Sequence, residues 1–558
     1  MTQKIRQEII DNLFLNSWKP FAWIIAIGFI LYVQTLSYNF TYFDDHMLIL
    51  DNQKYLSDAS NIFTAFKEDI FRRAEGQYYY RPVLMATFIF DAQIGGVSPV
   101  MYHFSNMFFH LLASCLLFIF LLKMKYRRDL SLFFSLLFTV HPALTQAVAW
   151  IPGRNDLLMA IFALTAFVFF IDFMGTGNLK YYFLHIFFFI VSLFTKEVSL
   201  PLILLFVLYY FLIRKDNVFI RNYKILAVGW LAGIIVWFLM RSHAMAHQIP
   251  LNPDKMIASI FEGLPGLLIF AGKILLPINL SVVSSLKDSS LIYGIIVLVA
   301  IAGVLYLSKN KRYKFIIFGL IWFVIFLLPT FLNFVITNNL FFHEFRIYLP
   351  MVGAIIILME IDIIKNLDFR KQKNLLISAI IIIIGFGLTF SYSSAFRNKI
   401  MLWGNAAETS PKFLYAQGMF GLKCLEENML DKAEMQFKRI LEIAPNDYKS
   451  HYYLGIIYAR KNMLNEADEE FNSAISVNPS AQALCDIGEV YYEQGRFDKA
   501  ESKWKKATEI NPDYIDAYIK LAKLYYEQKN IIALKSCVVQ LKKRNIDIPE
   551  EILNLIKK

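Results

Sequence analysis

The sequence predicts an all-α protein in which a polytopic membrane helical bundle, residues 1–400, precedes a helical-repeat solenoid, residues 401–558. Composition is the first observation behind this prediction. Of 558 residues, 57% are hydrophobic, and long apolar runs alternate with short charged loops, as in proteins with several membrane spans. The second observation is a helical pattern after Trp403 that repeats every 33 to 34 residues.

The positive charge follows the loops of the membrane half. The net charge is +11, yet residues 393–558 hold 24 Lys and Arg against 23 Asp and Glu. The excess is spread between spans rather than gathered in one groove-sized patch, so we expect a lipid bilayer as partner and no nucleic acid. Lys4 and Arg6 place the N-terminus in the cytoplasm. The run 18–37 lacks a small-residue cleavage site and is expected to stay as an anchor.

About eleven crossings are expected, with a first outer loop at about 38–99 and a basic inner loop at Lys123–Arg128. Segment 257–276 is ambiguous. A full crossing there would put Lys309–Lys314 and Lys365–Lys373 outside, against the charge rule. We therefore interpret it as a surface or re-entrant helix, and expect 291–307, 315–336, 347–364 and 375–392 to complete the bundle. An odd number of crossings places the C-terminal part outside the cytoplasm.

The repeat in the C-terminal part has a fixed set of small and aromatic residues. It consists of Pro445, Pro479 and Pro512; the pairs Ala433 and Phe437, Ala467 and Phe471, Ala500 and Trp504; and Gly421, Gly455 and Gly488. This spacing matches the tetratricopeptide (TPR) pattern, in which small residues let paired helices pack closely. We predict about four repeats; the alternative is a helical bundle with chance periodicity. TPR solenoids bind extended peptides or partner proteins, so a polypeptide partner is expected.

An aspartate pair directly follows the first span. Asp44 and Asp45 lie in the stretch FTYFDDHMLILDN, just beyond the apolar run. Ionisable groups at that depth are costly and often mark a site. Either carboxylate could accept a proton from an acceptor hydroxyl or hold a metal ion. The alternative is that one of them caps a short helix beginning at His46.

Further polar residues recur at the outward ends of the predicted spans. Each has a plain structural explanation, such as an interfacial anchor, a local ion pair or a satisfied histidine. Together they are expected on one membrane face, where cations suit a phosphate and carboxylates suit proton abstraction. The set is Tyr80, Arg81, His103, His110, His141, Arg154, Asp156, Lys196, Glu197, Glu344 and Arg346.

These residues carry a family resemblance. The runs YRPVLMATFIFDAQIGGVSPVMYHFSNMFFH, HPALTQAVAWIPGRNDLLMAIF and EFRIYLP, with the Lys196–Glu197 turn, resemble the transmembrane-and-TPR-containing (TMTC) protein O-mannosyltransferases and their bacterial relatives. That group belongs to the C-type glycosyltransferase superfamily, and the likeness covers nearly the whole chain. One departure is that Phe345 separates Glu344 from Arg346, which the relatives usually have adjacent.

The resemblance implies an inverting glycosyltransferase that uses a polyprenyl-phosphate-linked sugar as donor substrate. Asp44 or Asp45 would be the base toward an acceptor hydroxyl, most simply that of a protein Ser or Thr. Arg81, Arg154, Lys196 and Arg346 would bind the donor phosphate. Some superfamily members also use a divalent metal, for which no complete ligand set is evident in the sequence.

Two other classes of function compete with this one. A non-catalytic membrane anchor that presents a TPR scaffold for envelope assembly explains the C-terminal half but not the polar groups. A transporter would have ionisable residues near the middle of the membrane and matching broken helices in two halves, which the sequence lacks. The short chain with few repeats favours a bacterial inner membrane, with the active site and the TPR part on the extracytoplasmic side.

Overall fold

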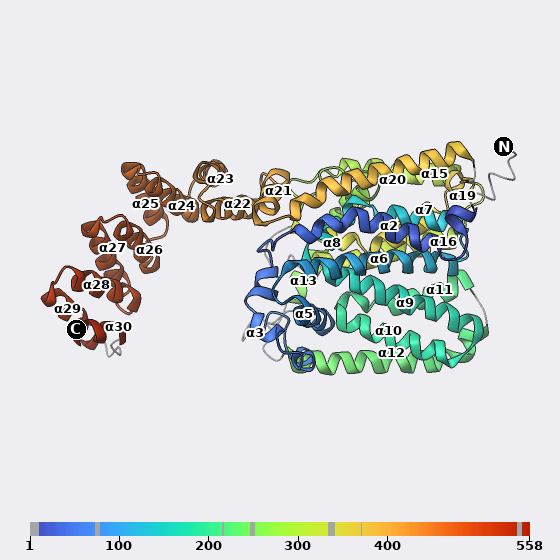
Figure 1. The fold of residues 1–558 in the computed structure, drawn as a ribbon, viewed down its shortest axis with the longest axis horizontal. Coiled ribbons are helices and arrows are strands. Elements are labelled where there is room, and N and C mark those ends of the chain that lie inside the picture. Colours follow the sequence, from blue (N-terminus) through green and yellow to red (C-terminus); the bar gives the residue numbers. More distant parts are fainter. Residues whose placement is uncertain are drawn as a thin grey trace. The chain divides into compact units, whose positions relative to one another are not determined.

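The computed structural model describes residues 11–72, 79–214, 217–245, 252–332, 341–369, 371–543 and 550–557. The chain divides into two compact units, Met1–Ser410 and Pro411–Lys558. Both are helical, and within the described residues the only strands are β1 (Ser284–Ser285) and β2 (Phe341–Phe342), which pair antiparallel (Figure 1). The all-α prediction is confirmed.

The first unit is a bundle of long apolar helices joined by short turns (Figure 1). Its helices are α2 (Lys19–Tyr32), α3 (Gln53–Leu56), α4 (Asn61–Thr64), α5 (Pro82–Gly95), α6 (Pro99–Lys123), α7 (Arg128–Thr139), α8 (Thr145–Ala149), α9 (Arg154–Thr176), α10 (Leu179–Thr195), α11 (Leu202–Tyr209), α12 (Asn217–Ala244), α13 (Pro253–Gly263), α14 (Pro265–Leu275), α15 (Ile292–Leu307), α16 (Tyr313–Leu327), α18 (Pro350–Leu358), α19 (Asp362–Lys365), α20 (Gln372–Ser393) and α21 (Lys399–Thr409). Short 3-10 and π turns adjoin them: η1 (Asp11–Leu15), η2 (Val33–Ser37), η3 (His46–Leu50), η4 (Ala65–Lys67), η5 (Pro142–Leu144), η6 (Ile151–Gly153), η7 (Glu197–Ser199), η8 (Tyr210–Arg214), η9 (Leu328–Leu332), η10 (Glu344–Ile347) and η11 (Ser394–Phe396).

Seven helices of the described chain are long and apolar enough to cross a membrane, or nine if each of two bent pairs is one span. The bent pairs are α7 with η5–α8, at 54°, and α13 with α14, at 42°. Of the other expected crossings, α10 and α15 are apolar helices of 17 and 16 residues, and α18 has only nine. The predicted first outer loop also contains an apolar helix, α5, which the sequence pattern did not indicate. The number eleven therefore stays a prediction.

Helix α9 forms the centre of the bundle, and α12 and α20 lie at its periphery. In α9, 78% of the most apolar window is buried, against 28% and 17% in α12 and α20. Helix α9 packs against both α6 and α10. The peripheral helices expose Ile and Leu side chains outward, such as Ile383 and Leu239. An apolar exterior of this extent is what a bilayer solvates and water does not.

The basic loops meet at one end of the bundle. Tyr126 donates a hydrogen bond of 3.0 Å to Glu360, which is also paired with Arg312. Arg127 donates to the carbonyl oxygen of Lys365 at 3.1 Å. The clusters at 123–128 and 309–314 and the described part of 365–373 thus belong to one face, while α3 lies at the opposite end of the helices (Figure 1). This is the arrangement that the charge argument about segment 257–276 required.

The second unit consists of helix pairs in the described part of 411–558. They are α22 (Leu414–Glu426) with α23 (Leu430–Ile443), α24 (Tyr448–Arg460) with α25 (Leu464–Val477), α26 (Ala481–Glu493) with α27 (Phe497–Ile510), and α28 (Ile515–Glu527) with α29 (Ile531–Lys543), followed by α30 (Glu550–Lys557). In each of the first three pairs a glycine faces the aromatic ring of the next helix. A Cβ on Gly421, Gly455 or Gly488 would lie 2.9, 2.4 or 2.4 Å from that ring. The small-and-aromatic pattern of the sequence is therefore a packing contact.

Substituting Gly455 with Ala tests this contact. The new methyl group would overlap the Phe471 ring, and overpacking of this kind costs about 1–3 kcal/mol. We expect Gly455→Ala to lower the melting temperature of the full-length protein, followed by circular dichroism. Gly418→Ala is the control, since its Cβ meets nothing closer than 3.7 Å and should not destabilise. Equal melting temperatures for the two variants would contradict the packing argument.

Candidate active site at one end of the bundle

The aspartate pair lies in a strained loop between α2 and α3. Asp44 has a φ of 67° and Tyr42 a φ of 55°, both in the left-handed region. Such conformations cost roughly 1–3 kcal/mol each and gather at functional sites, and Asp tolerates them better than most residues. The ring of Phe43 packs against Trp150 and Trp403, which holds the loop in place.

The two carboxylates have different surroundings. Asp45 is 1% exposed and accepts hydrogen bonds from the Thr41 amide at 2.6 Å, the Thr41 hydroxyl at 2.8 Å and the Phe43 amide at 3.1 Å. Burial raises the pKa of Asp45 to about 6, and the neighbouring charge of Asp44 adds to the rise. Asp44 is only half-buried. Asp45 therefore holds the loop together, and Asp44 is the more accessible carboxylate.

The capping alternative is wrong for Asp45. This residue does precede η3, but its side chain makes no capping hydrogen bond to that helix. Its carboxylate bonds backward, to residues 41 and 43.

Three of the predicted phosphate-binding cations converge. Arg81 directly precedes α5, Lys196 lies between α10 and η7, and Arg346 belongs to η10. Burial lowers the pKa of Lys196, and the charges of Arg346 and Arg81 lower it further. Segments far apart in the sequence thus bring their positive charges to one place.

Negative groups of the cluster do not neutralise it fully. Lys196 donates to both oxygens of Asp156, at 2.8 and 2.7 Å, and the pair is buried. Arg81 lies 3.7 Å from Glu197, a long ion pair, and its buried Nε–H has no hydrogen-bond partner in the described chain. No ion pair among the described residues involves Arg346. Unused N–H groups on buried cations are what an anionic ligand would satisfy.

Tyr79 links the cations to the aspartates. The Arg81 guanidinium lies 4.7 Å from the centre of the Tyr79 ring. Burial raises the pKa of Tyr79, and the charges of Arg81, Arg346, Glu197 and Asp44 all act on it. Arg81 therefore lies against Tyr79, and Arg346 and Asp44 act on it electrostatically; sequence reasoning missed this residue in favour of Tyr80. Tyr80 instead donates its hydroxyl to the Phe66 carbonyl and is 2% exposed.

Arg154 is not available to a phosphate, which corrects the expectation from sequence. It is fully buried and forms an ion pair with Asp91 at 2.6 Å. Its other N–H groups donate to Asn106 at 2.7 Å, to the Tyr102 carbonyl at 2.8 Å and to Thr87 at 3.2 Å. The guanidinium joins helices α5, α6 and α9, so its function is structural.

Two of the predicted histidines are also structural. His110 contacts the Tyr348 hydroxyl at 2.7 Å and the Thr139 carbonyl at 3.0 Å. His141 accepts from the Ala143 amide and bonds the Ile274 carbonyl at 2.8 Å. His103 is 1% exposed, packs edge-on against Tyr38, and neither of its ring nitrogens has a hydrogen-bond partner in the described chain.

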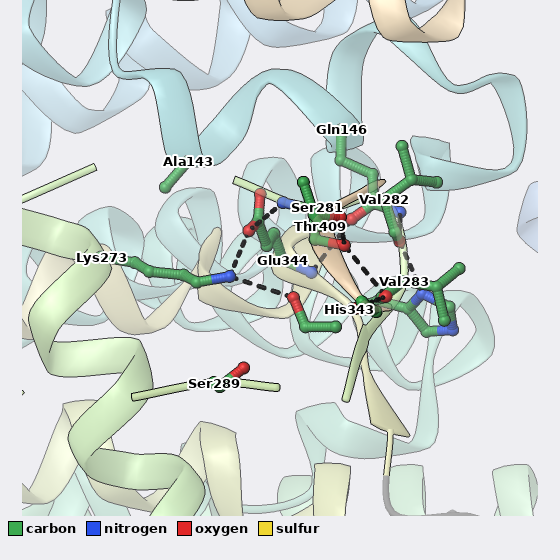
Figure 2. A network of polar contacts seen from close by, with 12 residues as sticks. Ala143, Gln146, Lys273, Ser281, Val282, Val283, Ser289, His343, Glu344 and Thr409 are labelled. Atoms are coloured by element: carbon green, nitrogen blue, oxygen red, sulfur yellow. Dashed lines mark hydrogen bonds and ion pairs between the residues drawn. The ribbon is translucent and has the colours of Figure 1, made fainter. Parts of the chain in front are cut away.

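Glu344 belongs to a third buried ion pair, with Lys273 of α14 (Figure 2). Sequence reasoning missed Lys273, although a signal was present, because a lone lysine inside the apolar run PGLLIFAGKILLP is costly unless it is paired. In the described chain, no group of three or more His, Cys, Asp or Glu side chains could hold a metal ion.

The comparisons with known proteins agree with this architecture. A tetratricopeptide repeat model matches residues 448–480, and a TPR repeat model matches 488–529. The chain is 22% identical over 95% of its length to Protein O-mannosyl-transferase TMTC3 of Homo sapiens, and 24% identical over 86% to Protein O-mannosyl-transferase F38B6.6 of Caenorhabditis elegans. It spans 65% and 64% of the length of these two relatives. A crystal structure of MamA matches 26% of the chain and 89% of its own, at 21% identity and a TM-score of 0.23, too low to bear on the fold.

The fold and the site define a polytopic helical membrane protein that carries a TPR unit. Within that class the chain is TMTC-like, because it is similar along 95% of its length to the protein O-mannosyl-transferase TMTC3 of Homo sapiens and has TPR repeats after its apolar helices.

Removing Arg154 tests its structural assignment. Arg154→Met would leave Asp91 as an unpaired buried charge, which costs about 3–5 kcal/mol. We expect a strongly reduced yield of folded protein and a lower melting temperature, both partly restored by adding Asp91→Asn. A variant that folds normally but binds polyprenyl phosphate poorly would show that Arg154 contacts the ligand after all.

Proposed function

We propose that the chain is a membrane glycosyltransferase that moves a sugar from a polyprenyl-phosphate donor to a Ser or Thr hydroxyl of an extracytoplasmic protein. The observation that carries the proposal is the cluster of Arg81, Lys196 and Arg346, in which Lys196 and Arg346 share the Phe345 ring and Arg81 lies on Tyr79, a residue on which Asp44 also acts electrostatically. The relatives are named protein O-mannosyl-transferases, which supports mannose as the sugar and protein as the acceptor.

The arrangement suits a single displacement with inversion. The acceptor oxygen attacks the anomeric carbon while its proton passes to the Asp44 carboxylate, since a free hydroxyl is a poor nucleophile at neutral pH. The bond between the anomeric carbon and the phosphate oxygen breaks, and its electron pair leaves with the polyprenyl phosphate. Arg81, Lys196 and Arg346 stabilise the charge that grows on that phosphate.

The same geometry supports a proposal about access and sidedness. The site lies at the end of the bundle opposite the basic loops, which the positive-inside rule places in the cytoplasm. The site would then face the extracytoplasmic side of a bacterial inner membrane, where a lipid-linked donor enters from the bilayer. The TPR unit would engage the acceptor polypeptide.

A scaffold without catalysis remains the second candidate, favoured by the four helix pairs of the TPR unit, a kind of surface that binds partners. Expression with a polyprenyl-phosphate-sugar donor separates the two. The enzyme adds the mass of a sugar to Ser- or Thr-containing peptides, detected by mass spectrometry. Co-purified partners without any added mass would favour the scaffold.

Matched amide variants distinguish the two aspartates. Asp44→Asn should reduce the rate of transfer by about 10²–10⁴-fold, which is the usual contribution of a general base to the rate. Its melting temperature should be unchanged. Asp45→Asn should lower the melting temperature, because its amide cannot accept all three hydrogen bonds of the loop. If Asp44→Asn kept wild-type turnover, Asp44 would not be the base.

Donor binding should depend on pH through Lys196. Burial lowers the pKa of Lys196 to about 8, although Asp156 opposes the change. The ammonium is charged below this pH and neutral above it, so the donor KM should rise between about pH 7 and 9. Lys196→Arg keeps its charge over this range and should move the rise to higher pH. An identical pH profile in this variant would exclude Lys196 from phosphate binding.

A further inference from the structure

The pair of Lys273 and Glu344 is buried where the bent helix α14 meets the turn that carries Arg346. The side chain of Lys273 is 8% exposed and that of Glu344 is not exposed at all. Figure 2 shows the Lys273 ammonium reaching across to the Glu344 carboxylate, and Lys273 also donates to the Ser284 hydroxyl at 3.0 Å. Two charges removed from solvent to this degree are tolerated only as a pair.

Both carboxylate oxygens of Glu344 accept hydrogen bonds. Its Oε1 also accepts from the Ser281 amide at 2.8 Å, and its Oε2 accepts from the Tyr392 hydroxyl at 3.1 Å. The side chain of Gln146 accepts from the backbone amides of Glu344 and Phe345, at 3.0 and 3.3 Å. The carboxylate and the turn η10 are thus fixed together.

The ion pair of Lys273 with Glu344 affects whether the Arg346 guanidinium stays available to a phosphate. Glu344 is two residues from Arg346, and an unpaired carboxylate there would attract the guanidinium or repel an incoming phosphate. With Glu344 committed to Lys273, the strongest charges on Arg346 are those of the cluster itself, Asp156 foremost. Arg346 keeps a positive charge that no ion pair in the described chain engages.

We propose that Lys273 is a positioning residue for the donor phosphate, which acts through Glu344 by neutralising it so that Arg346 stays available. The inference rests on the proposed function. It predicts that removing Lys273 impairs donor binding whereas removing the Glu344 charge does not, a difference that a merely structural role does not predict.

The experiment measures donor KM, kcat and melting temperature for Lys273→Met, Glu344→Gln and the double variant. In Lys273→Met the carboxylate keeps the Ser281 and Tyr392 donors, which favour its ionised form. The donor KM should therefore rise on the order of tenfold, a usual size for coupling between sites. Glu344→Gln should not raise it. The double variant should bring KM back toward the wild-type value.

Arg312 and Glu360 provide the matched control, because they form a similar ion pair, with Glu360 fully buried, among the basic loops at the other end of the bundle. Arg312→Met and Glu360→Gln should lower the melting temperature without changing donor KM. If Lys273→Met does not fold, Lys273→Arg, which keeps the charge, should retain the wild-type donor KM, and the double variant still reports on the coupling.

The outcomes distinguish a failure of this inference from a failure of the proposed function. Binding of sugar-free polyprenyl phosphate, measured as a rise in melting temperature, is the readout that does not need turnover. If the wild-type protein neither binds it nor transfers sugar, the proposed function fails and the inference with it. If it does both, but Lys273→Met and Glu344→Gln raise KM equally or change only stability, the inference alone is overturned.

Discussion

A charge inside an apolar bundle must be paired, and the membrane unit depends on how that requirement is met. Arg154 is paired with Asp91, Lys273 with Glu344 and Lys196 with Asp156. The partners of each pair are at least 40 residues apart in the sequence and lie on different segments, so the same interactions that neutralise charge also fix the fold. Breaking one member of such a pair costs far more than replacing both, because a lone buried charge has lost its hydration without gaining a partner.

The site is the place where this pairing is incomplete. Arg81 has a buried Nε–H without a partner, and Arg346 is in no ion pair among the residues described. The backbone is strained at Asp44, and charges of both signs act electrostatically on Tyr79. A structure optimised for stability alone would not leave such groups together. The proposed anionic donor would complete the pairing and would account for their retention.

The sequence predicted which residues gather near this site, but not which of them form the cluster and which are structural. Local sequence patterns indicate where spans end, the period of the TPR repeats and which polar residues share a face. For this reason the helical architecture and the cluster of three cations could be predicted. Arg81 and Arg154 look alike in sequence, and only the ion pair with Asp91 separates them. That partner lies on α5, in a stretch expected to be a loop. Lys273 escaped notice because its partner is 71 residues away.

Phe345 explains how Arg346 keeps its place although the sequence departs from the family pattern there. Its ring packs against Trp150 and His343, with centroids 5.4 and 5.1 Å apart. The Lys196 ammonium and the Arg346 guanidinium each lie 5.5 Å from the centre of the same ring. Cations are attracted to aromatic faces, more strongly where water is excluded. The residue that separates Glu344 from Arg346 thus supplies a surface shared by two of the three cations, while Glu344 is left to Lys273.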